Sequence, residues 1–133
     1  MHENPNKEAM SYIGESRKNL QLAGNDGIFY NDEMYVKTAC GIAYTGLLKA
    51  MDFYFDIKGT PKRRGRKSIE YYQTVLKDMD KTLLKHLNCA YRILYLNGYY
   101  EGETKIKAIE VGLDSAISII SKLKPYSKNG FKI

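Results

Sequence analysis

The chemically most distinctive part of this chain is a basic segment, Lys58–Lys67, which reads Lys-Gly-Thr-Pro-Lys-Arg-Arg-Gly-Arg-Lys. Six of its side chains are basic and none is acidic. Its proline and glycines predict a loop, and dense positive charge is typical of a surface that binds phosphates or carboxylates. A solvated connector without a specific ligand is the alternative. The predicted anion-binding residues are Lys58, Lys62, Arg63, Arg64, Arg66 and Lys67.

A second group of basic residues lies at and beyond the end of the last predicted helix. If sequential helices are antiparallel neighbours, this lysine-rich tail lies at the same end of the molecule as the basic segment. Segment and tail together carry +10, against a formal net charge of +6 for the whole chain, so the remainder carries −4. Because acidic residues gather at the opposite end, the molecule is predicted to be charge-polarised. The tail lysines are Lys122, Lys124, Lys128 and Lys132, and the opposite end gathers Asp26, Asp32, Glu33, Glu101 and Glu103.

Catalytic residue types are sparse in the rest of the chain. The two histidines are His2, near the terminus, and His86, beside an apolar stripe, where a structural role is the simpler interpretation. Cys40 and Cys89 fall inside helical patterns and are interpreted as buried structural thiols. No phosphate loop, zinc-ligand pair or nucleophile elbow is found. We therefore predict a protein that is not an enzyme, with no catalytic residue, metal or cofactor.

The aromatic composition is unusual, with 12 tyrosines and no tryptophan. Tyrosine tolerates a half-buried position because its ring packs while its hydroxyl stays wet. Most of the tyrosines are therefore expected to pack in the core and at its boundary. Five aromatic residues near the basic segment form the neck of a predicted helical hairpin, where they could support base stacking. They are Phe53, Tyr54, Phe55, Tyr71 and Tyr72.

Helical spacing of apolar residues predicts the elements that position these groups. The first helix runs from a cap at Asn6 to Ala23, and the second from a cap at Asn31 to just before Gly59. The third spans 68–97, either as one helix or as two nearly collinear pieces with Asp80 capping the second, and Gly98 stops it. The last runs from about Glu103 to Leu123. Gly41 and Gly46 in the second helix predict close approach of another helix.

These elements predict an all-α fold, an antiparallel up-down four-helix bundle, with a fifth helix if the third segment breaks near Asp80. Residues 1–133 form one domain, with about 1–5 and 125–133 flexible. No apolar run is long enough to span a bilayer, and no apolar leader precedes the cysteines. A cytoplasmic protein with reduced thiols and no membrane contact is expected.

Several motifs resemble those of an uncharacterised bacterial family of small all-helical proteins. They are Tyr35-Val36-Lys37, the run Ala39 to Ala50, Arg66 to Tyr72, and Leu87 to Tyr91 followed by Gly98-Tyr99. The second helix is also similar to that of HEPN domains. That resemblance implies a four- or five-helix bundle, often dimeric, of the kind found in toxin–antitoxin and nucleotidyltransferase partner systems.

The HEPN resemblance does not extend to the ribonuclease motif, in which a histidine follows an arginine by a few residues. None of the arginines here has such a histidine after it. The sequence therefore favours a non-catalytic interaction module that self-associates as a homodimer and whose basic end contacts an acidic protein or a nucleic acid. One alternative is a HEPN-like ribonuclease or toxin–antitoxin component using Arg92, His86 and Tyr95. Another is a structural subunit of a larger assembly.

Overall fold

The computed structural model describes residues 4–60 and 67–126. Across these ranges the chain is helical apart from its loops and two isolated β-bridges, so the all-α prediction is confirmed. The elements are α1 (Pro5–Ala23), α2 (Glu33–Ile57), α3 (Ile69–Met79), α4 (Lys81–Ala90), the π-helix η1 (Tyr91–Tyr100), α5 (Ile106–Ser121) and the short 3₁₀ turn η2 (Lys124–Tyr126).

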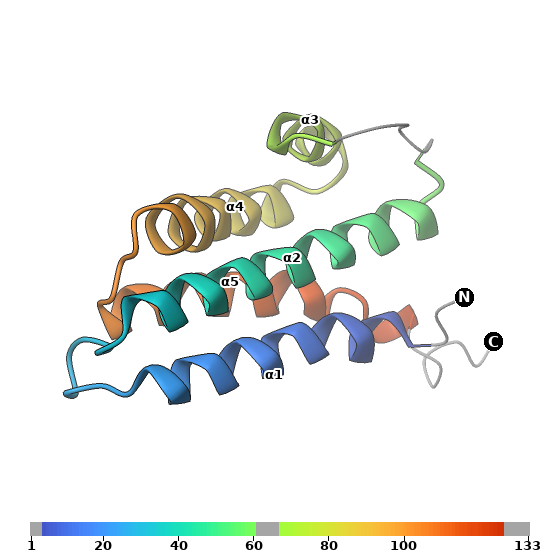
Figure 1. Cartoon of the computed structure of the whole chain (residues 1–133). Coiled ribbons are helices and arrows are strands. Elements are labelled where there is room, and N and C mark those ends of the chain that lie inside the picture. Colours follow the sequence, from blue (N-terminus) through green and yellow to red (C-terminus); the bar gives the residue numbers. More distant parts are fainter. Residues whose placement is uncertain (1–3, 61–66, 127–133) are drawn as a thin grey trace.

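Helix α2 is the centre of the packing. Figure 1 shows α1, α2 and α5 lying alongside one another, with α1 running opposite to the other two. The third helical segment breaks at Asp80, as one of the two sequence-based alternatives predicted, because the Asp80 carboxylate accepts a hydrogen bond from the Leu83 amide (3.0 Å) and caps α4. Figure 1 shows α3 nearly end-on, so α3 and α4 are not the nearly collinear pieces that were predicted.

Two predicted helix caps are each displaced. Helix α1 is capped by Asn4, whose side chain accepts from the Lys7 amide (2.9 Å), and Asn6 instead donates to the Ile120 carbonyl of α5 (3.1 Å). Helix α2 is capped by Asp32, which accepts from the Met34 amide (2.9 Å), rather than by Asn31. In both cases neighbouring residues offered equivalent capping side chains, so local sequence alone did not discriminate between them.

The third helical segment does not stop at Gly98. It continues as η1 to Tyr100, with the Glu101 amide bonded to the Leu96 carbonyl five residues back (3.2 Å). Gly98 is buried inside this helix, and the glycine with positive φ (+74°) that follows its end is Gly102. The predicted loop at Tyr99–Gly102 is therefore wrong for its two tyrosines, which are helical.

The core follows the predicted stripes closely. On α2, Tyr35 was predicted to face inwards but has 38% of its surface exposed, whereas the neighbouring Val36 is fully buried. The largest fully buried side chains come from every helix of the described chain except the short η2 turn. They include Ile13, Leu47, Met51, Leu76, Leu83, Leu87, Leu94, Leu113 and Ile120.

Glycines bring α2 into close contact with its neighbours, as predicted. A Cβ added at Gly46 would meet Tyr12 Cβ of α1 and lie 3.2 Å from the Ala9 carbonyl oxygen. On another side, the Cys40 side chain of α2 occupies the space that a Cβ at Gly98 would take. These contacts bring the helix backbones closer than side chains at those positions would allow, and compensate for the low helix propensity of glycine.

The two loops at the acidic end are joined by backbone hydrogen bonds. The Tyr30 amide donates to the Thr104 carbonyl (2.8 Å), and the Ile106 amide to the Ile28 carbonyl (3.0 Å). This confirms that loops 24–32 and 101–105 meet at one end. Helix α5 begins at Ile106 rather than near Glu103, because the backbone of Thr104 and Lys105 pairs with the other loop instead of joining the helix.

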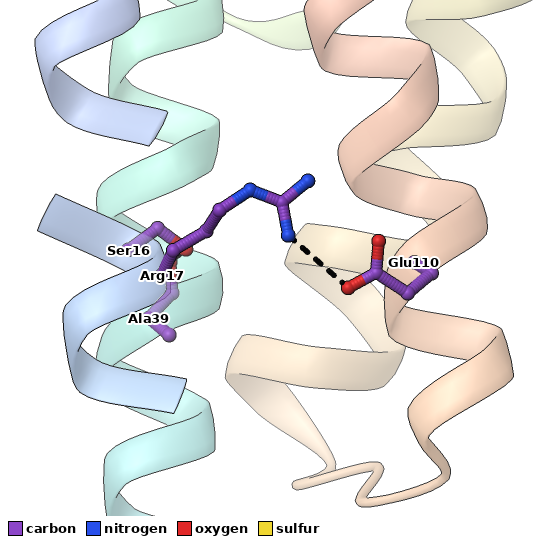
Figure 2. A network of polar contacts seen from close by, with 4 residues as sticks. All are labelled: Ser16, Arg17, Ala39 and Glu110. Atoms are coloured by element: carbon purple, nitrogen blue, oxygen red, sulfur yellow. Dashed lines mark hydrogen bonds and ion pairs between the residues drawn. The ribbon is translucent and has the colours of Figure 1, made fainter. Parts of the chain in front are cut away.

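Adjacent residues of α1 connect it to two different helices. The buried Ser16 hydroxyl donates to the Ala39 carbonyl of α2 (2.8 Å), while Arg17 reaches across to Glu110 of α5 (3.3 Å), as Figure 2 shows. The first contact satisfies a buried hydroxyl, whereas the second is partly exposed and contributes little to stability. In the part of the chain that the structure describes, no helix is both long and apolar enough to cross a membrane.

The close approach at Gly46 predicts that Gly46→Ala destabilises the fold. The added methyl collides with Tyr12 and with the backbone of α1, and the cost should exceed the gain of ~1 kcal/mol in helix propensity. We expect a net loss of about 1–3 kcal/mol in the free energy of unfolding, measured by urea denaturation.

Gly14→Ala is the matched control, because Gly14 is an exposed glycine of α1 with nothing within 4 Å of the added Cβ. This variant should be unchanged or stabilised by up to about 1 kcal/mol. Equal effects of the two substitutions would show that the contact with Tyr12 does not limit the approach of α1 to α2.

Candidate functional site

Two of the six predicted anion-binding residues lie in the described chain. Lys58 is the C-terminal cap of α2, with its Nζ 5.5 Å from the centre of the Tyr54 ring. Lys67 lies just before α3, with its Nζ 3.0 Å from Asp52 Oδ1 of α2. The other four, Lys62, Arg63, Arg64 and Arg66, lie outside the described residues.

Both flanks of the basic segment are fixed to the last turns of α2. On the incoming side, the Thr60 amide donates to the Phe55 carbonyl (2.9 Å). On the outgoing side, Asp52 accepts from both Lys67 and the hydroxyl of Tyr72 in α3 (3.0 Å each). The chain therefore leaves α2 and returns to it at the same place.

The end of α5 lies near the same region. Lys122 Nζ is 3.8 Å from Asp80 Oδ2. Burial raises the pKa of Tyr54, the charge of Lys58 opposes this rise, and the charge of Asp80 adds to it. This agrees with the prediction that the tail leaves at the basic end. The structure adds two carboxylates that the sequence did not place there, Asp52 and Asp80, which pair with two of the lysines.

The aromatic neck beneath the basic segment is packed rather than open. Phe55 lies 5.9 Å, centroid to centroid, from both Tyr71 and Tyr72. Tyr54, Phe55 and Tyr72 are buried. These rings hold α3 against α2, and the hypothesis that they form a base-stacking platform is not supported by their burial.

The residues of the ribonuclease alternative lie along one continuous helical segment, His86 on α4 and Arg92 and Tyr95 on η1. Tyr95 packs among other tyrosines, and in the described ranges no hydrogen bond or ion pair joins it to His86 or Arg92. Cys40 is buried, as predicted, and burial raises the pKa of its thiol to about 12, whereas Cys89 is half-buried. No group of three or more potential metal ligands occurs among the residues that are described.

A second candidate site is a groove lined by tyrosines, which we call the tyrosine groove. It has a volume of about 560 Å³ and lies where α1, α2 and η1 meet. This size is in the range of small-molecule sites. Its lining residues are Tyr12, Thr38, Gly41, Ile42, Tyr44, Thr45, Tyr95 and Tyr99.

The tyrosine rings beside the groove form a continuous array. Along η1, Tyr91 stacks on Tyr95 (5.5 Å between centroids, 19° between planes) and Tyr95 on Tyr99 (5.8 Å, 16°). Tyr44 of α2 joins the array 5.2 Å from Tyr95, and Tyr100 meets Tyr95 edge-on at 5.4 Å. The spacing of four residues on a helix lets successive side chains contact one another and produces this stack.

The floor of the groove is shaped by Gly41. A Cβ at this position would lie 3.0 Å from the Tyr99 ring, so glycine lets that ring lie against the backbone of α2. Burial, followed by the neighbouring tyrosines, raises the pKa of both Tyr44 and Tyr95. The phenols therefore stay neutral well into the alkaline range.

Sequence reasoning missed the tyrosine groove as a site. The signal was the spacing of Tyr91, Tyr95 and Tyr99, but it was interpreted only as core and boundary packing. That interpretation is correct for the buried Tyr44 and incomplete for Tyr99, which is 48% exposed. The lining residues that α1 and α2 contribute to the groove could not be identified without the fold.

Comparison with known proteins places the chain in a family but does not assign a function. It belongs to the family described as a domain of unknown function, DUF5618, which it matches over residues 4–125. It is also similar to a protein of unknown function from Dyadobacter fermentans, with 31% identity and a TM-score of 0.83 over 92% of this chain and 95% of that chain. No curated protein matches. The likeness to HEPN domains stays a prediction.

The Asp52 contacts predict a graded loss of stability. Asp52→Ala removes both the ion pair with Lys67 and the acceptor for the buried Tyr72 hydroxyl, and should lower the free energy of unfolding by about 1–3 kcal/mol. Asp52→Asn keeps an oxygen that can accept from Tyr72 and should cost at most ~1 kcal/mol. Urea denaturation of both variants measures the difference, and equal losses would assign the whole effect to the ion pair.

The raised pKa values of buried groups predict alkaline destabilisation. Above the ordinary pKa values of Cys40 (9.0) and Tyr44 (10.0), the unfolded chain loses protons that the folded chain keeps, so stability falls as pH rises. The melting temperature should therefore decrease from pH 9 to 11.

Tyr44→Phe removes one of these groups, so its melting temperature should fall less over the same pH range. Tyr35→Phe, which removes an exposed hydroxyl from the same helix, should follow the parent protein. An identical pH dependence for all three proteins would contradict the assigned role of Tyr44.

Proposed function

We propose that this protein is a non-catalytic interaction module whose basic end contacts an anionic partner. The observation that carries the proposal is that both flanks of the basic segment return to the last turns of α2, at Phe55 and Asp52. The two flanks therefore lie at one end of the molecule, and several cations in the sequence between them would act together on a polyanion.

At this end of the molecule, some of the lysines already form ion pairs with carboxylates. Lys67 and Lys122 lie beside Asp52 and Asp80 and are partly neutralised. The sequence between the two flanks still contributes four cations and no acid: Lys62, Arg63, Arg64 and Arg66. Arginine is well suited to phosphate because its planar group binds two oxygens at once. A nucleic acid is therefore the partner class that we test first, and an acidic protein surface is the alternative.

Self-association is part of the same proposal. Near the acidic end, the side chains of Leu22, Ile28 and Met34 are more than half exposed, at 64%, 61% and 67%. Exposed apolar side chains grouped on one part of a surface are typical of contact sites between proteins. Contact between copies at this end would leave the basic end of each copy free for the anionic partner.

The decisive experiment removes charge at two places. Arg63→Ser, Arg64→Ser and Arg66→Ser together should weaken binding of a single-stranded oligonucleotide in a low-salt electrophoretic shift assay. They should also reduce the salt dependence, because fewer counterions are released; up to three phosphate contacts would be lost.

Lys77→Ser, Lys81→Ser and Lys85→Ser form the matched control, because these exposed lysines of α3 and α4 carry the same total charge. They should retain more of the binding. Equal losses would show that net charge alone is responsible, and absence of any shift with the parent protein would remove nucleic acid as the partner class.

A further inference from the structure

The tyrosine groove has a chemical character distinct from that of the basic end. Four of its eight lining residues are tyrosines, and none carries a charge. We propose that this groove is a binding site for an organic cation of the quaternary ammonium class. The proposal is independent of the anionic partner, because it concerns a different surface and a ligand of opposite charge.

Tyrosine rings favour a cation because the face of an aromatic ring carries excess negative charge. A cation within about 6 Å of a ring centre is attracted to it, and the attraction increases when water is excluded. Tyr12 and Tyr99 reach the same cavity from α1 and η1, and Tyr44 adds a ring from α2. Tyr95 also lines the cavity but is stacked on Tyr91 and Tyr99, so it offers less of its faces to a ligand. A ligand in the groove therefore meets rings supplied by three helices.

The surroundings of the groove are also favourable to positive charge. Helix η1 ends at Tyr100, one residue after the lining residue Tyr99, and the C-terminal end of a helix carries partial negative charge from its dipole, although several of its last carbonyls accept backbone hydrogen bonds here. Next to this terminus, Gly102 lies against the carboxylate of Glu33, and Glu101 is exposed. Lys37 pairs with the same Glu33 carboxylate (3.3 Å), which limits the opposing effect of the lysine.

A quaternary ammonium fits this site better than a primary ammonium. It has no N–H donors that would need oxygen partners, and among the lining side chains only threonine and tyrosine hydroxyls offer oxygen. Its methyl groups can pack on the rings while its charge interacts with their faces. The volume of about 560 Å³ is large enough for a headgroup of this kind with part of its substituent.

The test compares a cation with its uncharged isostere. Choline and 3,3-dimethyl-1-butanol have the same shape, and only choline is charged. We would titrate each into the full chain at fixed ionic strength and follow the tyrosine ring signals by NMR. We expect choline to shift the signals of Tyr12, Tyr95 and Tyr99 and to bind at least several-fold more tightly than the alcohol.

Variants at the exposed Tyr99 separate ring chemistry from shape. Tyr99→Phe keeps the aromatic face and should bind choline within about twofold of the parent, whereas Tyr99→Leu should weaken binding by about two- to thirtyfold. Tyr35→Leu is the matched control, because it removes a partly exposed tyrosine of α2 that does not line the groove. It should leave choline binding unchanged.

Three results would overturn the proposal. Equal affinity for choline and the alcohol would show an apolar groove without preference for charge. No shift with choline at concentrations up to tens of millimolar would show that the groove does not bind this class. Equal loss with Tyr99→Leu and Tyr35→Leu would place any binding elsewhere on the molecule.

Discussion

The fold depends on the close packing of neighbouring helices against α2. Gly46 lets α1 lie against it on one side, and the contact between Gly98 and Cys40 does the same for η1 on another. Because helix backbones meet here almost directly, there is little room for compensating shifts, and a single methyl group at either place collides with a neighbouring helix. The tyrosine groove exists because a third glycine, Gly41, lets the Tyr99 ring lie against the backbone of the same helix.

Local patterns in the sequence were sufficient to predict most of the helices. The apolar spacing of residues 9–23, 69–94 and 109–123 corresponds to the buried faces of α1, α3 to η1, and α5. The break at Asp80 was one of two alternatives, since a capping carboxylate in mid-helix can either begin a new helix or face solvent. In the structure Asp80 caps α4, and the rings of Phe55, Tyr71 and Tyr72 also dock α3 on α2, which is a long-range interaction.

Apart from the displaced helix caps, the errors in prediction arise from contacts between residues that lie far apart in the sequence. Gly98 was interpreted as a helix stop, although its function is to make room for Cys40, a residue far away in the sequence. The pairing of Lys67 with Asp52 and of Lys122 with Asp80 likewise joins residues on different elements. The sequence therefore gives the charge of a segment, but only the fold shows which of its charges are already paired. The tyrosine groove could not be predicted without the relative positions of the three helices that supply its lining residues.

Helix α3 contributes few residues to the core, and this affects local unfolding of the molecule. It buries only two residues, Tyr72 and Leu76, and it is connected to the basic segment on one side and to the break at Asp80 on the other. Segments with so few buried contacts unfold locally before the rest of a domain. Amide hydrogens of α3 should therefore exchange with solvent much faster than those of α2, and detachment of this helix would leave the remaining core intact.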